Sequence, residues 1–108
     1  MDSNLNNRVG FFSSKMLGNR IMLGTDGMHS DMLQSAKSAY LSGLAHDDID
    51  FQSAYSRLRN VHRYIKQNNY SGDGENNLVI LNYDSPTELN SSNFFGHFIY
   101  GLNSNHIE

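Results

Sequence analysis

The side chains that could carry chemistry in this sequence are its carboxylates and its five histidines, because the 108 residues include no cysteine. A thiolate nucleophile and a thiolate metal site are therefore excluded. Asp26 is the strongest candidate, in a Gly-Thr-Asp-Gly sequence that follows a short apolar run. For an isolated Asp-Gly pair, the more common interpretation is a turn in which Asp26 accepts hydrogen bonds from nearby backbone amides.

The histidines give a weaker signal than Asp26. His29 follows it by three residues and could face the same site, although a surface histidine at the start of a helix is an equally good interpretation. His62 falls on the apolar face of an expected helix and is predicted to be a packed, hydrogen-bonded core residue. The spacing of the other three histidines, His46, His97 and His106, indicates no chemistry.

Four elements are expected in the first part of the chain. They are a short helix over residues 11–17 that stops at Gly18, a strand over residues 20–23, a helix that begins after Ser30 and repeats apolar residues as far as Leu44, and a long helix over residues 51–66. The strand prediction rests on an unbroken apolar run cut off by a glycine-containing turn, which is typical of a strand buried on both faces. Each long helix has one apolar face and one polar face.

A polar, glycine-containing loop separates the second part of the chain. Residues 67–77 are the best candidate boundary, which gives parts 1–70 and 71–108. Residues 78–83 are apolar and β-branched and predict a strand, which is expected to be buried on both faces over residues 78–81. Residues 94–102 predict either a strand or a short helix. This order of elements predicts an α/β or α+β fold.

Composition limits the classes of partner. Eight lysines and arginines against 11 aspartates and glutamates give a net charge of −3, and the basic residues are spread along the sequence, which argues against a nucleic-acid partner. No apolar run approaches the roughly 20 residues that a membrane span needs, so no membrane partner is expected. Because the N-terminus carries no secretory pattern, the cytoplasm is the expected location.

Residues 23–33, which contain the Gly-Thr-Asp-Gly sequence, resemble the end of barrel strand eight in the amidohydrolase superfamily. The branch is that of the aminohydrolases and chlorohydrolases, including the one associated with selenium metabolism. Residues 2–10 resemble the loop after strand seven, residues 77–84 a strand of the flanking sheet domain, and residues 93–102 the segment that follows it. Four ordered matches are more specific than a Gly-Thr-Asp triplet alone.

The resemblance implies the last units of a metal-dependent (β/α)8 barrel followed by part of a flanking β-sheet domain. It makes Asp26 a catalytic metal ligand that orients the attacking hydroxide, and it makes His29 and Asn4 substrate contacts. In the family the metal would be zinc or iron, and the substrate a small heterocycle whose carbon–nitrogen or carbon–halogen bond is hydrolysed. A whole barrel needs about 250 residues, so this chain would be a truncated reading frame.

Two functions stay open at this point. The first is metal-dependent hydrolysis, for which a complementing chain would have to supply ligands, because the family's His-x-His pair is absent and one carboxylate cannot hold a catalytic zinc. The second, preferred for the isolated chain, is a non-catalytic α+β fragment that binds no metal and acts as a self-associating module. Strands at residues 21–23 and 78–81 would lack the neighbours of a full enzyme, so a two-fold dimer is expected.

Overall fold

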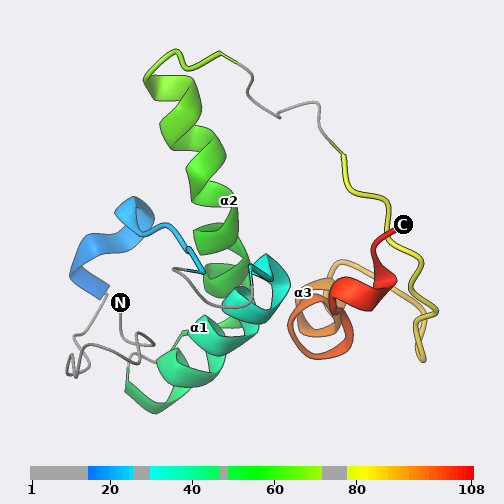
Figure 1. The fold of residues 1–108 in the computed structure, drawn as a ribbon. Helices are drawn as coiled ribbons and strands as arrows, with labels where there is room; N and C mark the ends of the chain where they lie inside the picture. Colours follow the sequence, from blue (N-terminus) through cyan, green and yellow to red (C-terminus); the bar gives the residue numbers. More distant parts are fainter. Residues whose placement is uncertain (1–14, 26–29, 47–48, 72–77) are drawn as a thin grey trace.

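The computed structural model describes residues 15–25, 30–46, 49–71 and 78–108. Within these ranges the chain is mainly helical (Figure 1). In chain order the elements are the 3-10 segment η1 (Lys15–Arg20), α1 (Met32–His46), α2 (Phe51–Gln67), α3 (Phe94–Gly96), the π-helical turn η3 (His97–Gly101) and the 3-10 turn η4 (Ser104–His106). None of the helices in these ranges has the length and apolar character that a membrane crossing requires.

The predicted α/β or α+β fold, with barrel units and a flanking sheet, is wrong. Among the described residues, β pairing is limited to one antiparallel bridge between Leu81 and Ile107. The runs at residues 20–23 and 78–83 therefore do not form the predicted sheet strands. High β propensity reports how well side chains suit a pleated, partly buried surface, and it does not supply the neighbouring strand. Residues 94–102, which the sequence left open between strand and helix, are helical as far as Gly101.

Both long helices begin at an aspartate. At the start of α2, Oδ1 of Asp50 accepts a hydrogen bond from the backbone N–H of Ser53 at 2.7 Å. At the start of α1, Oδ1 of Asp31 accepts from the backbone N–H of Gln34 at 3.0 Å. These bonds satisfy N–H groups that have no partner within the first helical turn. The prediction of α2 is confirmed. For α1 the sequence predicts Ser30 as the capping residue, whereas the capping side chain is that of Asp31, one residue later.

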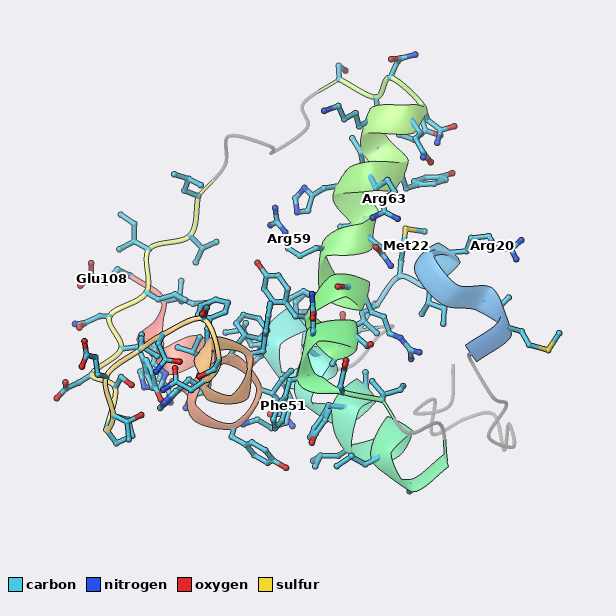
Figure 2. The ribbon with its side chains drawn as sticks, turned by 180° about the vertical axis from the view of Figure 1, so that it is seen from behind. Arg20, Met22, Phe51, Arg59, Arg63 and Glu108 are labelled. Atoms are coloured by element: carbon cyan, nitrogen blue, oxygen red, sulfur yellow. The ribbon has the colours of Figure 1, made fainter. Side chains whose placement is uncertain are left out.

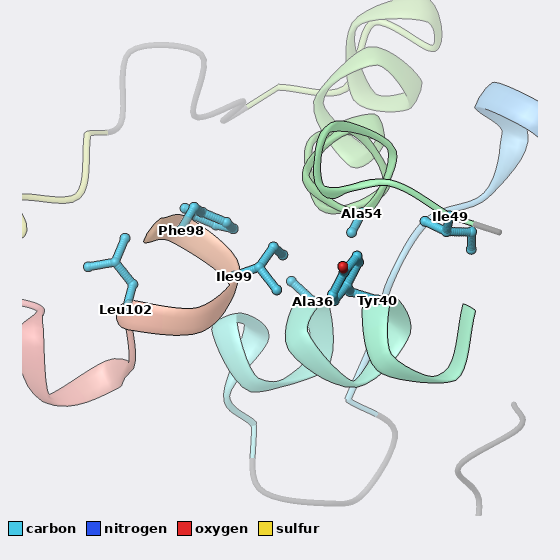
Figure 3. Packing of buried hydrophobic residues seen from close by; sticks show 7 residues of the cluster. All are labelled: Ala36, Tyr40, Ile49, Ala54, Phe98, Ile99 and Leu102. Atoms are coloured by element: carbon cyan, nitrogen blue, oxygen red, sulfur yellow. The ribbon is translucent and has the colours of Figure 1, made fainter. Parts of the chain in front are cut away.

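The core lies where α1, α2 and η3 meet (Figure 3). Ala36 of α1 and Ala54 of α2 are fully buried, and their small side chains let the two helices approach closely. Ile99 of η3 is 1% exposed and points toward Ala36. The remaining buried apolar residues are Tyr40, Ile49, Phe98 and Leu102. Burial of an isoleucine side chain stabilises a fold by about 1.5–3 kcal/mol, so η3 is a main part of this core.

Aromatic rings attach the C-terminal helical segment to the long helices. The ring centroid of Tyr55 on α2 lies 4.9 Å from that of Phe98 and 5.3 Å from that of Phe95. Phe51 faces this segment in Figure 2, and its ring centroid lies 4.6 Å from that of Tyr40 on α1. Edge-to-face and tilted pairs at these separations are favourable beyond the area that they bury. Residues 94–101 are thus packed as a helix against helices.

The apolar faces predicted for the long helices are only partly buried. Leu44 is 47% exposed and Val61 is 38% exposed, although the periodicity placed both in the core. The sequence also missed a buried polar residue, Asn60, whose Nδ2 donates to the backbone carbonyl of Ile21 at 2.8 Å. The stretch predicted as a strand at residues 20–23 is therefore tied to α2 by a side chain.

Candidate functional site

The catalytic site that the family resemblance implies cannot be built from the described residues. Asp26, His29 and Asn4 all lie outside them, so their roles as metal ligand and substrate contacts stay predictions. In the part of the chain that the structure describes, no group of three or more His, Cys, Asp or Glu side chains is placed to hold a metal ion. The candidate site has to come from other residues.

Consecutive apolar residues are exposed at the start of the C-terminal segment. Leu78 is 87% exposed, Val79 65%, Ile80 64% and Leu81 38%. We call residues 78–82 the edge segment; it runs extended along the periphery of the molecule, away from α2 (Figure 1). The prediction of a strand buried on both faces is wrong here, because the described residues provide no sheet to cover it. Each exposed methylene forgoes about 0.8 kcal/mol of burial free energy.

One side of the edge segment is already paired with the C-terminus. The carbonyl of Ile80 accepts a hydrogen bond from the backbone N–H of Glu108 at 3.0 Å. The backbone N–H of Asn82 donates to the carbonyl of His106 at 2.7 Å. These two bonds frame the bridge at Leu81. In an antiparallel ladder this pattern makes residue 81 a non-hydrogen-bonded position, with its own backbone groups directed to the opposite side.

The other side of the edge segment is its free edge. Successive residues of a strand direct their N–H and C=O groups to alternate sides, so the groups of Val79 and Leu81 point away from the C-terminus. No backbone hydrogen bond links either residue to another described residue. The side chain of Leu81 shares a face with its bridge partner Ile107, which is 46% exposed. The free edge thus combines backbone groups able to form hydrogen bonds with apolar side chains.

His97 anchors the chain that follows the edge segment. Its Nδ1 lies 2.9 Å from the hydroxyl of Tyr83, and its Nε2 lies 2.8 Å from the hydroxyl of Thr87. A neutral imidazole donates through one nitrogen and accepts through the other, so the two hydroxyls can satisfy both. A hydroxyl beside an imidazole is also the spacing of a nucleophile and its general base. Thr87 is exposed, however, and open water competes for its hydroxyl.

The turn η4 brings the C-terminus to the edge segment. The backbone N–H of Asn103 donates to Nδ1 of His106 at 3.1 Å, and Oδ1 of Asn103 accepts from the backbone N–H of Asn105 at 3.0 Å. Because Nδ1 of His106 is an acceptor, the ring proton lies on Nε2. The ring of His106 also packs edge-on against Tyr83, with centroids 5.2 Å apart. These contacts fix the position from which Ile107 reaches Leu81.

No role was predicted for His97 and His106, and the local spacing of residues could not have indicated one. The partners of His97 stand ten and fourteen residues before it, in a stretch with no regular structure. The apolar run at residues 78–81 is the signal that the sequence offers for this site, but it predicts burial, and the residues are exposed. The other two histidines lie on the long helices: His62 is partly buried with Nε2 3.3 Å from Nη1 of Arg59, and His46 ends α1.

Charge is distributed unevenly around the edge segment. The segment itself carries no charged side chain. Residues 71–108 contain five acidic residues and no lysine or arginine, whereas α2 contains four basic residues and no acidic one. A strand that approaches the free edge therefore meets a neutral stretch next to acidic neighbours such as Asp84.

No protein-family model matches the sequence, and no solved structure matches it significantly.

Proposed function

We propose that this chain is a non-catalytic interaction module that associates with a second copy of itself. The exposed apolar run of residues 78–81 supports the proposal. Contiguous apolar patches of more than a few hundred Å² are rare on soluble monomers and commonly mark interaction sites. Cyclic two-fold dimers are the commonest oligomers, so a second copy of the chain is the partner that we propose. The cytoplasm stays the proposed location.

The local structure of the edge segment favours association. A two-stranded ribbon is at best marginally stable in water, and three or more strands with an apolar face are needed for independent stability. Among the described residues, the edge segment has one bridge, to Ile107. Additional strands would cover its apolar side chains and strengthen this pairing.

Light scattering coupled to size-exclusion chromatography, over a dilution series, tests the proposal. We expect a mass above the 12.2 kDa of one chain that falls on dilution. Ile80→Lys places a charge in the edge segment and should shift the protein to the monomer. Leu41→Lys makes the same kind of change on α1, at a leucine that is 50% exposed, and should leave the mass unchanged. A 12.2 kDa species at every concentration, with a cooperative melt, would contradict the proposal.

The family resemblance motivates a second proposal, that the chain derives from a metal-dependent hydrolase in which Asp26 is a metal ligand. Zinc or iron would then be held with histidines from a complementing chain, because a catalytic zinc normally has three protein ligands and a water. For the chain alone we expect no zinc that survives dialysis and no ammonia release from deaminase substrates. If the chain held stoichiometric zinc and Asp26→Ala lost it, the result would favour the hydrolase proposal over the interaction module.

A further inference from the structure

We propose that two copies of the chain pair through the free edge of the edge segment, as antiparallel strands related by a two-fold axis at Ile80. This inference rests on the proposed self-association and names the contact that produces it. The edge segment of one copy binds the edge segment of the other, and backbone hydrogen bonds hold the two together.

The backbone restricts how two such edges can meet. The backbone groups of Ile80 and Asn82 are directed toward the C-terminus. The carbonyl of Ile80 accepts from the N–H of Glu108 at 3.0 Å, and the N–H of Asn82 donates to the carbonyl of His106 at 2.7 Å. The groups of Val79 and Leu81 face outward. In an antiparallel pair, two residues exchange hydrogen bonds only if both direct their groups toward each other. Hydrogen-bonded pairs between the copies are therefore limited to odd-numbered residues.

One register uses both outward residues. If Val79 lies opposite Leu81 of the second copy, Leu81 lies opposite the second copy's Val79, and each pair exchanges two hydrogen bonds. Ile80 then lies opposite Ile80 of the second copy, across the two-fold axis. A shift by two residues in either direction would pair one of the outward residues with itself and move the other beyond the edge segment. The central register is the one that satisfies the whole free edge.

The edge segment carries no charge that would repel a second copy. Residues 78–83 carry no charged side chain, so the central register places no like charges opposite each other within the segment. The flanking charges are acidic, so a partner strand with carboxylates among its pairing residues would bring them close to Asp84. Like charges directly opposite each other destabilise a strand pair. The neutral, apolar segment of a second copy avoids this repulsion.

The edge segment lies at the outside of the fold, and pairing with a second copy would extend its two-stranded ribbon. In Figures 1 and 2 the edge segment lies at the outer margin of the molecule, away from α2. Pairing joins two ribbons into four strands, in the order C-terminus, edge, edge, C-terminus. One face would then carry Ile107, Leu81 and Val79 from both copies, and the other Leu78 and Ile80. Four strands with apolar faces exceed the minimum for a stable sheet.

Single cysteines test the register, because the chain has none of its own. In the central register the two Ile80 Cα atoms lie about 4.5 Å apart, within the roughly 4.4–6.8 Å that disulfides span. Ile80→Cys should therefore give a covalent dimer under a mild thiol oxidant. In the central register residues 78 and 82 are each displaced by four positions along the strand, about 13 Å, from the same residue of the second copy. Neither Leu78→Cys nor Asn82→Cys should therefore cross-link alone. An equal mixture of these two, one carrying a small tag, should cross-link. All three positions are exposed, and circular dichroism verifies that each variant is folded.

The outcomes separate this inference from the proposed function. We expect cross-linking of Ile80→Cys at least about tenfold above that of Leu78→Cys or Asn82→Cys alone. Equal cross-linking at all three positions, or none at position 80 in a sample that light scattering shows to be dimeric, would overturn the strand pairing and leave self-association in place. A monomer at every concentration would overturn both.

Discussion

The hydroxyl of Tyr83 occupies the space in which a Cβ atom on residue 101 would lie. Gly101 ends η3, and the lack of a side chain there lets Tyr83 cross the helix end and reach Nδ1 of His97 at 2.9 Å. The chain that follows the edge segment is fixed to the core by this close approach.

Gly101→Ala should therefore destabilise the fold. The new methyl group would overlap the hydroxyl of Tyr83, and overpacking of this kind typically costs about 1–3 kcal/mol. Urea unfolding followed by circular dichroism measures the change in the free energy of unfolding. Gly24→Ala is the matched control, because a Cβ atom there meets nothing within 4 Å. An equal effect at both positions would show that Tyr83 does not constrain residue 101.

Tyr83→Phe isolates the hydrogen bond from the packing of the ring. Removal of the hydroxyl leaves Nδ1 of His97 without this partner and should lower the free energy of unfolding by about 0.5–1.5 kcal/mol. In a His97→Phe background the same change should have almost no further effect, because the bond is already lost. Additive effects in this double-mutant cycle would mean that the two side chains do not interact.

The helices were predictable where local signals and packing agree. Asp50 caps α2 as a residue of its type should, and the apolar repeat that follows matches the helix over Phe51–Gln67. The strand predictions failed because neither the apolar run at residues 20–23 nor the β-branched run at residues 78–83 lies in a sheet within the part of the chain that the structure describes. Their actual contacts, such as Asn60 to the carbonyl of Ile21, join residues 39 positions apart. No periodicity encodes such a pair.

The candidate site was less accessible to sequence reasoning than the helices. The resemblance pointed to Asp26, which lies outside the described residues, and it said nothing of His97 or His106. The exposure of residues 78–81 follows from the absence of a covering layer in the described fold, which composition cannot reveal. The expectation of a dimer came from the same idea of an uncovered strand, and it stays a prediction.

Asp50→Ala should shorten or fray α2. Loss of a capping side chain costs about 0.5–2 kcal/mol, because the N–H of Ser53 loses its acceptor at 2.7 Å. Thermal unfolding followed at the helix signal measures the loss. Asp50→Asn keeps an acceptor at the same place and should retain most of the stability. A full loss in Asp50→Asn would show that charge, and not the hydrogen bond, stabilises this end.

The same carboxylate gives α2 a dependence on pH. Hydrogen bonds from the side chain and backbone of Ser53 lower the pKa of Asp50 below its ordinary value of 3.8. The folded state therefore holds the proton more weakly than the unfolded chain. This contribution to stability is fully present above pH 3.8 and is lost as the pH falls through the lowered pKa. In Asp50→Asn this acid-dependent loss should be smaller, and identical acid titrations of the two proteins would contradict the assignment.

Ile99→Ala should be among the most damaging substitutions in the described chain. Ile99 is 1% exposed, and it connects η3 to Ala36 in the contact between the long helices. Truncation of a buried isoleucine to alanine costs about 2–5 kcal/mol, because the neighbours close the cavity only in part. Small domains have only about 5–15 kcal/mol of total stability, so a large fall in Tm is expected. Leu41→Ala, at a residue that is 50% exposed, should change Tm little. If both variants melted at the temperature of the unaltered protein, residues 94–101 would not be docked on α1 and α2, and the anchor that positions the edge segment would be lost with them.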